Sequence, residues 1–170
     1  MPTPEQLARL YAVVPYAQAT MRKWKIPASV TLAQWIFESS WGTSGLCTEC
    51  NNCFGIEHRQ GDNAEPYAMY ATQEFSSSSA KARMEMAPFV KYPSVAASFD
   101  AHGKLIGASA RYLQAISSPD VPSFCRALQA CGYSTNPRYA VGLLDVIRQL
   151  NLTQYDKLPP IPMPTRTETV

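Results

Sequence analysis

The chain has 170 residues, of which 46% are hydrophobic and 16% charged, a balance that indicates one folded globular domain with a sizeable core. Its formal net charge of +2 is too small to indicate a nucleic-acid-binding protein, although a mildly basic surface suits an anionic polymer. No apolar run approaches 18 residues, so no membrane-spanning helix is expected. Residues 1–6 lack the basic and apolar segments of a secretory signal. We therefore expect the protein to stay in its cell or to leave it by lysis or a specialised route.

Two helices are predicted at the start of the chain. Residues 4–24 form the first, because apolar side chains recur there at helical spacing and basic residues follow. The second lies within residues 26–42, where Pro27 suits a first helical position, Ser29 is an alternative cap, and Gly42 and Gly45 offer the stop. It is apolar on nearly every side, so we expect it to be buried. Its apolar residues are Val30, Leu32, Ala33, Trp35, Ile36, Phe37 and Trp41.

Glu38 stands out in the second helix because it places a carboxylate among apolar residues near the helix C-terminus. Burial disfavours the charged form, and so does the negative end of the helix dipole, so both effects raise its pKa. A carboxylic acid that keeps its proton near neutral pH can protonate the leaving oxygen of a glycosidic bond. The alternative is a narrow solvent-facing edge on which Glu38 has no chemical role, and the helix alone favours neither interpretation.

The middle of the chain changes its character twice. Residues 42–62 are rich in Gly, Asn, Cys and Thr, and they predict an ordered loop. Between residues 66 and 92, two segments alternate in apolar character on either side of the serine run 76–79. This pattern predicts a β-hairpin with a serine-rich tip.

Three further helices are predicted, one beginning at residue 93, one over residues 120–131 and one beginning at Asn136. Residues 157–170 are rich in proline and predict an extended tail that adds nothing to the core. Residues 1–156 then form a single α+β domain, in which a small β-hairpin lobe lies over a mainly helical body.

Four segments of the chain, taken in order, resemble one enzyme family. They are Ile26-Pro-Ala-Ser-Val-Thr-Leu-Ala-Gln with Glu38-Ser-Ser-Trp-Gly-Thr-Ser-Gly-Leu, Asn51-Asn-Cys-Phe-Gly-Ile, Phe89-Val-Lys-Tyr-Pro-Ser-Val-Ala-Ala-Ser-Phe, and Gly132-Tyr-Ser-Thr-Asn-Pro-Arg-Tyr-Ala. The chain resembles the peptidoglycan N-acetylglucosaminidases of glycoside hydrolase family 73, a group that includes flagellar, autolysin and phage wall hydrolases. The segments follow the family's order and span most of the chain.

The resemblance implies a lysozyme-like fold, in which a helical lobe and a β-lobe flank a groove for a glycan strand. It places Glu38 on the family's catalytic acid, and Glu74, in Thr72-Gln-Glu-Phe, on the second acidic residue of the β-flap. Glu74 would either activate water across a wide groove or steady charge while the substrate's own acetamido oxygen attacks. Without the resemblance, a glutamate near a hairpin tip is interpreted as a solvated surface charge.

Aromatic side chains near the groove are expected to stack on sugar rings. The substrate-binding candidates are Trp41, Asn52, Phe54, Tyr112 and Tyr139. Core packing is the alternative for each aromatic residue, and loop capping is the alternative for Asn52. The resemblance places Tyr133 and Tyr139 beside the acid, so one hydroxyl would hold the substrate's acetamido group or orient Glu38. We count Tyr133 with the catalytic residues.

Two features depart from the family. Asp100 comes one place before the family's usual acidic residue, so no role is assigned to it. Cys47, Cys50 and Cys53 occupy a segment where the family ordinarily has small or basic residues. With His58 they could ligate zinc, or two cysteines could form a disulfide. Because the cysteine count is odd and no secretory signal is present, we expect reduced thiols, no metal, and activity that survives chelator and reductant.

We therefore predict an endo-β-N-acetylglucosaminidase that needs no cofactor and hydrolyses the β-1,4 bond between N-acetylglucosamine and N-acetylmuramic acid in peptidoglycan. A muramidase or lytic transglycosylase is the alternative on the same fold, and a non-catalytic wall-binding module is the alternative of another class. The expected partners are a glycan strand and, for a toxin delivered into competitors, a cognate inhibitor protein. We expect a monomer that acts on the bacterial wall, in the periplasm or at the cell surface.

Overall fold

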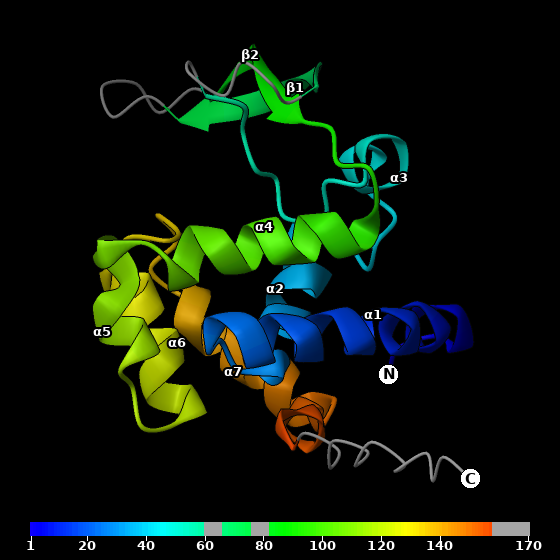
Figure 1. Ribbon diagram of the computed structural model, residues 1–170. Helices are drawn as coiled ribbons and strands as arrows, with labels where there is room; N and C mark the ends of the chain where they lie inside the picture. Colours follow the sequence, from blue (N-terminus) through cyan, green and yellow to red (C-terminus); the bar gives the residue numbers. More distant parts are fainter. Residues whose placement is uncertain (60–65, 76–81, 158–170) are drawn as a thin grey trace, which may run out of the picture.

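A body of helices with a two-stranded β-hairpin above it makes up the computed structural model (Figure 1). Residues 1–59, 66–75 and 82–157 are described, and for residues 72–75 and 82–84 the description covers the backbone alone. The elements are α1 (Pro4–Trp24), α2 (Ala28–Ser39), α3 (Gly45–Cys50), β1 (Tyr67–Phe75), β2 (Ala82–Val90), α4 (Val95–Gly107), η1 (Ala110–Tyr112), α5 (Leu113–Ile116), α6 (Val121–Ala130), α7 (Tyr139–Gln149) and η2 (Leu152–Asp156). The predicted α+β arrangement is confirmed, whereas the predicted serine tip and the tail from residue 158 lie outside the described residues.

The predicted central helix is α2, and every residue in it except Phe37 and Glu38 is buried. It packs against α1, α7 and η2. The helix begins after Pro27, which is its N-cap and not its first residue as predicted. It ends before Gly42, because Ser40 and Trp41 already have left-handed backbones with φ of 49° and 61°.

The N-terminus of α2 is capped from the far end of the chain. Pro27 makes no side-chain hydrogen bond to the helix, whereas Asp156 accepts from the backbone N–H and from the hydroxyl of Ser29, each at 2.8 Å. A carboxylate in this place stabilises a helix because it satisfies free N–H groups at the positive end of the dipole. Burial raises the pKa of Asp156, although the bonds from Ser29 oppose the rise. Ser29 is thus a donor to the cap, and its predicted role as the cap itself is wrong.

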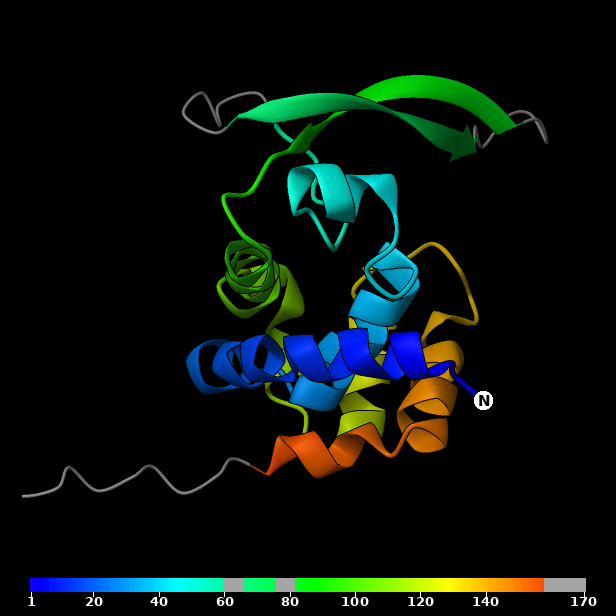
Figure 2. The same ribbon diagram turned by 90° about the vertical axis from the view of Figure 1, so that its right-hand side faces the viewer.

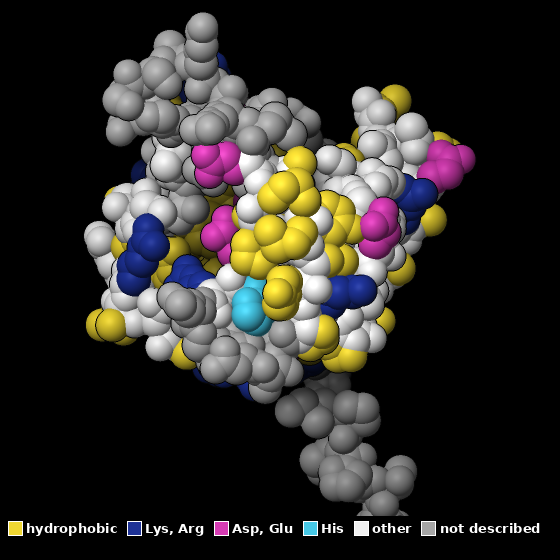
Figure 3. Space-filling view, turned by 90° about the horizontal axis from the view of Figure 1, so that it is seen from above, with side chains coloured by type: hydrophobic (Ala, Val, Ile, Leu, Met, Phe, Trp, Pro, Cys, Tyr) yellow, Lys and Arg dark blue, Asp and Glu magenta, His cyan; other side chains and the backbone are white. Residues whose placement is uncertain are grey.

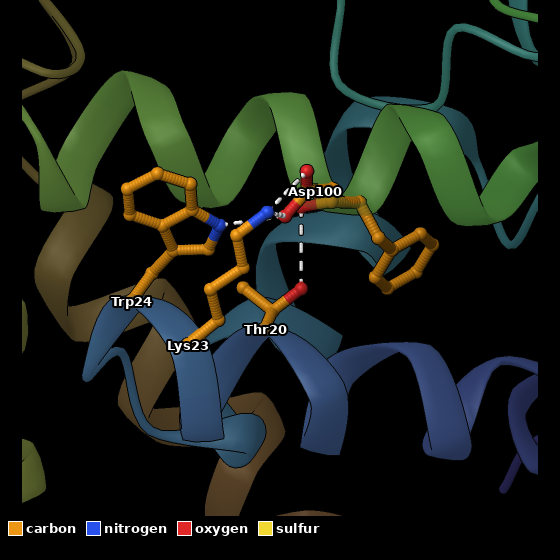
Figure 4. A network of polar contacts seen from close by, with 5 residues as sticks. Thr20, Lys23, Trp24 and Asp100 are labelled. Atoms are coloured by element: carbon orange, nitrogen blue, oxygen red, sulfur yellow. Dashed lines mark hydrogen bonds and ion pairs between the residues drawn. The ribbon is translucent and has the colours of Figure 1, made fainter.

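A polar network joins α4 to α1 (Figure 4). Lys23 Nζ donates to both carboxylate oxygens of Asp100 at 2.9 Å, and Trp24 Nε1 donates to Asp100 Oδ1 at 2.7 Å. The Thr20 hydroxyl donates to the Phe99 carbonyl at 3.2 Å. Burial would raise the pKa of Asp100, but the bonds from Lys23 and Trp24 outweigh it and the pKa is lowered. Asp100, which had no role from the sequence, therefore holds two helices together.

Gly103 allows α4 to approach α1 closely, because an added Cβ would overlap the Trp24 ring and lie 2.8 Å from Thr20 Cγ2. We expect Gly103→Ala to lower the free energy of unfolding by about 1–3 kcal/mol in urea titrations, since overpacking outweighs the better helix propensity of alanine. Gly142→Ala in α7 is the control, because its new Cβ meets only the exposed Phe37 ring, at 3.3 Å, which can turn aside. Equal stability of the two variants would contradict the prediction.

The hairpin confirms the prediction for residues 66–92: β1 and β2 pair antiparallel along their whole length. The Tyr70 hydroxyl donates to Glu49 of α3 at 2.5 Å, which ties the hairpin to the body. Phe89 on β2 is buried. Other apolar side chains of the hairpin are exposed to solvent, namely Tyr67, Met69 and Met86.

The segment predicted as a loop, residues 42–62, contains the short helix α3. Asn51 then has a left-handed backbone with φ of 52°, and the chain turns back so that the Cα atoms of Cys47 and Cys53 lie 4.4 Å apart. Cys47 and Cys53 form a disulfide, so the prediction of reduced thiols is wrong for these two residues. The prediction had no helix in this segment, and without one there was no physical reason to expect the two cysteines close together. The free cysteines are Cys50, Cys125 and Cys131.

Reduction of the Cys47–Cys53 bond is expected to lower the melting temperature. The bond joins residues six positions apart, and closing so short a loop restrains the unfolded chain by about 2 kcal/mol. For a domain of this size that corresponds to about 4–8 °C. Thermal unfolding with and without reductant measures the shift, and the double variant Cys47→Ser, Cys53→Ser is the control that should not respond. A melting temperature indifferent to reductant would restore the original prediction.

The later helices follow the prediction with small shifts. Ser94 and Asp120 cap α4 and α6, and the side chain of each accepts a backbone N–H bond. α7 begins three residues later than predicted, because the Asn136 side chain accepts the N–H of Arg138 in a turn before the helix. The short turns η1 and α5 were not predicted.

Candidate active site

Glu38 lies in the last turn of α2, whose C-terminal end is on the side of the body that faces the hairpin (Figure 2). Its side chain is exposed, yet enough protein surrounds the carboxyl group for burial to raise its pKa. A large substrate can therefore reach an acid that keeps its proton to higher pH than an ordinary glutamate.

Two helices hold the carboxyl group of Glu38. The Tyr139 hydroxyl, from the first residue of α7, donates to Glu38 Oε1 at 3.4 Å and lowers the pKa of Glu38 against the larger effect of burial. Burial also raises the pKa of Tyr139, so its hydroxyl keeps its hydrogen over the range in which Glu38 titrates. Gln34, one turn before Glu38 in α2, donates to the Tyr139 oxygen at 3.0 Å. Gln34 was not among the predicted site residues, although a polar residue four positions before a glutamate in an apolar helix indicates that the two side chains share one face of the helix.

Tyr133 lies beside this pair. Its ring stacks on Tyr139, with centroids 5.6 Å apart and planes at 25°, and meets the rings of His102 and Tyr112 at 6.2 and 6.1 Å. Burial raises the pKa of Tyr133, and Tyr139 and Glu38 add to the rise. Both tyrosines are thus near the acid as the resemblance implied, and the hydroxyl that bonds Glu38 belongs to Tyr139.

A column of rings supports Tyr133 from behind. Phe54 stacks on His102 with centroids 4.0 Å apart, and Phe99 meets Phe54 edge-on at 4.9 Å. Burial lowers the pKa of His102 to about 3, so the imidazole is neutral at physiological pH. In the part of the chain that the structure describes, neither ring nitrogen of His102 has a hydrogen-bond partner.

Glu38 is exposed at the surface of the molecule. Two cavities of about 420 and 450 Å³, lined around Phe124 and Leu144, include neither Glu38 nor Tyr139. Figure 3 shows the face seen from above, on which the hairpin lies, with apolar side chains gathered in its middle and acidic side chains beside them.

The sequence profile of the Glucosaminidase family, described as mannosyl-glycoprotein endo-beta-N-acetylglucosaminidase, matches residues 14–152. The chain belongs to the glucosaminidase family. The resemblance to glycoside hydrolase family 73 is thereby confirmed.

Relatives of this glucosaminidase-family chain include wall enzymes. Exo-glucosaminidase LytG of Bacillus subtilis is 30% identical over 161 residues, which cover 92% of the chain and 55% of LytG. Peptidoglycan hydrolase FlgJ of Pseudomonas aeruginosa is 30% identical over 148 residues, which cover 84% of the chain and 36% of FlgJ. The catalytic domain of the autolysin Auto from Listeria monocytogenes is 26% identical with a TM-score of 0.78, over 91% of this chain and 89% of that domain. The lysozyme-like fold class is confirmed by such neighbours, while the chain spans only about a third to a half of LytG and FlgJ.

Several residues that were predicted to bind substrate lie in the core. Asn52 is 1% exposed, its amide donates to the carbonyls of Ile56 and Val90 at 2.8 and 2.9 Å, and its oxygen accepts from Ile56 at 3.0 Å. These bonds match the loop-capping alternative. Phe54 and Tyr112 are each 5% exposed, which leaves little ring surface for a sugar. Trp41 is half-buried against the core and keeps part of its surface open.

The family's second acidic position is Glu74, which lies in β1 opposite Arg83 of β2. Its side chain is not among those described, so a catalytic role for Glu74 stays a prediction.

Among the side chains that the structure describes, no three of His, Cys, Asp or Glu are grouped to hold a metal ion. Cys47 and Cys53 also cannot bind zinc as thiolates while they form the disulfide. Among the helices of the described segments, none has the length and apolarity needed to cross a bilayer.

Proposed function

We propose that this chain is an endo-N-acetylglucosaminidase, which hydrolyses the β-1,4 bond on the reducing side of N-acetylglucosamine in bacterial peptidoglycan. The observation that carries the proposal is Glu38, an accessible carboxyl group whose pKa burial raises and which Tyr139 contacts from a second helix. Family membership supports the glycosidase class, and the names of LytG and FlgJ support the substrate. The place of action is then the wall outside the cytoplasmic membrane.

Glu38 acts as the general acid. Its proton passes to the glycosidic oxygen as the bond from that oxygen to the anomeric carbon breaks and positive charge develops on the sugar ring. The carboxylate that remains accepts the hydrogen of Tyr139, and this bond is stronger to the charged form than to the acid. Tyr139 therefore stabilises the carboxylate that forms when Glu38 gives up its proton.

Glu74 supplies the second carboxylate, as a base or as a stabiliser of charge. Tyr70 contacts α3 through Glu49, so the face of β1 that carries Tyr70 is turned toward the body. Glu74 is four positions further along β1, and positions an even number apart in a strand belong to the same face of the sheet. This backbone register supports a place for position 74 on the face of the hairpin that is turned toward the body. Water activated there gives inversion, whereas attack by the substrate's acetamido oxygen leaves Glu74 to steady charge.

The sugar at each new reducing end tests the proposed function. Purified peptidoglycan is digested, the new ends are reduced with borohydride, and the sugar alcohols are identified by mass spectrometry. We expect N-acetylglucosaminitol on fragments of two or more sugars. N-acetylmuramitol would identify a muramidase, and 1,6-anhydro ends would identify a lytic transglycosylase. Release of single N-acetylglucosamine units would identify an exo-enzyme, the class that the name of LytG gives. Binding without any release of fragments would leave only a wall-binding module.

A further inference from the structure

Gln34 is a fully buried amide in direct contact with the acid's partner. Its side-chain Nε2 donates to the Tyr139 hydroxyl oxygen at 3.0 Å, and the residue is 0% exposed. In the described part of the chain its Oε1 has no hydrogen-bond partner. A buried amide with one half unsatisfied is costly, so packing alone is a weak reason for glutamine at this place in an otherwise apolar helix.

The direction of the Gln34 amide decides the direction of the Tyr139 hydrogen. A phenol donates one hydrogen and accepts through its oxygen. When the oxygen accepts from Gln34, the hydrogen is free to point at Glu38 Oε1, 3.4 Å away. With the amide reversed, Gln34 Oε1 would take that hydrogen and Glu38 would lose its donor. The first orientation is favoured because a carboxylate is a stronger acceptor than an amide oxygen.

We propose that Gln34 is a positioning residue, which holds the Tyr139 hydroxyl with its hydrogen toward Glu38. The proposal rests on the proposed function, because it acts through Glu38 as the general acid. Gln34 does not touch the substrate in this role. It sets how readily Glu38 gives up its proton.

The other titratable groups around the pair do not provide a substitute for this bond. Tyr133 faces both Glu38 and Tyr139, and Tyr112 lies behind Tyr133. Cys125 of α6 faces Tyr139, and burial raises the pKa of its thiol to about 12. None of these groups is a cation that could stabilise the carboxylate. The hydrogen bond from Tyr139 is the interaction that opposes burial at Glu38.

The test compares Gln34→Met, Tyr139→Phe and the double variant, by measuring kcat/KM for purified peptidoglycan across pH. Methionine keeps the length of the side chain and removes the donor. On the alkaline limb of this pH profile, activity falls because Glu38 loses its proton. We expect Gln34→Met to shift this limb by about half to one pH unit toward higher pH, because one hydrogen bond to the carboxylate is weakened. In the Tyr139→Phe background, Gln34→Met should add no further shift. An unshifted limb, or an equal shift in both backgrounds, would overturn the proposal.

Two controls keep the outcome readable. Thr31→Val removes another fully buried polar group of α2, whose hydroxyl donates to the Pro27 carbonyl, and it should keep the parent pH profile. If Gln34→Met fails to fold by circular dichroism, Gln34→Leu, which also keeps an apolar side chain in the core and carries no hydrogen-bond donor, should shift the limb in the same direction, and the parent limb in that variant overturns the proposal. Glu38→Gln separates the two levels of inference. Full activity of Glu38→Gln removes Glu38 as the general acid and the role of Gln34 with it, whereas an inactive Glu38→Gln beside an unshifted Gln34→Met removes the role of Gln34 alone.

Discussion

Glu38→Gln is expected to lower the rate of peptidoglycan hydrolysis by about 10²–10⁴-fold, the range that general acid catalysis contributes. Glutamine has nearly the same shape as glutamate but holds no proton for the leaving oxygen. Release of reducing ends from purified peptidoglycan is the measurement, and Glu5→Gln, the same change in the first turn of α1, is the control. Activity of Glu38→Gln within about tenfold of the parent would reject Glu38 as the acid.

The same variant should not lose stability. Burial raises the pKa of Glu38 in the folded protein above the value near 4.5 of an ordinary glutamate. The contribution of this proton to stability is therefore present below pH 4.5 and is lost as the pH rises through the folded pKa. Glutamine carries no charge to be buried, so at neutral pH the melting temperature should stay the same or rise. Loss of activity with an unchanged or higher melting temperature would show that the variant is folded and lacks only the acid.

Glu74→Gln is expected to lower turnover by at least about tenfold if Glu74 is the base, since a base contributes on the same scale as the acid. Azide, supplied with Glu74→Ala, tests the role directly. It can attack the anomeric carbon in place of water while Glu38 protonates the leaving oxygen, and the product is then a glycosyl azide of inverted configuration. Rescue of this kind supports the base, and a reduced rate without rescue supports attack by the substrate's acetamido oxygen.

Glu57→Gln is the matched control for Glu74→Gln. Glu57 is exposed and its backbone bridges Phe89 of β2, so the change removes the same charge beside the same hairpin. We expect parent activity for Glu57→Gln and parent stability for both variants. Normal turnover of Glu74→Gln would remove Glu74 from the site and leave Glu38 as the only acidic residue in the proposal.

Local pattern and family resemblance together predicted several residues that the structure brings close together in the candidate site. The apolar periodicity of α2 predicted a buried helix with an unusual carboxylate, and this needed no knowledge of the rest of the fold. Tyr133 and Tyr139 came from the resemblance, since nothing in their own spacing places them beside Glu38. The contact between Tyr139 and Glu38 joins residues 101 positions apart, and such contacts depend on how α2 and α7 pack.

Two features of the structure, the bonds of Asn52 and the disulfide, were not predicted from the sequence. Asn52 was a candidate for the substrate, and only the approach of β2 shows that its amide is already bonded to Ile56 and Val90. The Cys47–Cys53 bond required α3 and the left-handed turn at Asn51, neither of which has a strong local signal. For Asn52, the partner Val90 lies outside the segment that was interpreted, whereas for the disulfide both cysteines lie inside it and the element that was not predicted is α3.

The cap on α2 also sets an order of events during synthesis. Ser29 and Asp156 are 127 positions apart, and at about 5–20 residues per second the ribosome needs about 6–25 seconds to make the second after the first. For most of that interval, once Ser39 has been made, the nascent chain contains all of α2 without the carboxylate that caps it. A chain stopped before residue 156 would carry Glu38 on a helix that never receives its cap. The helix that bears the acid therefore reaches its final form only when the last turn of the described chain has emerged.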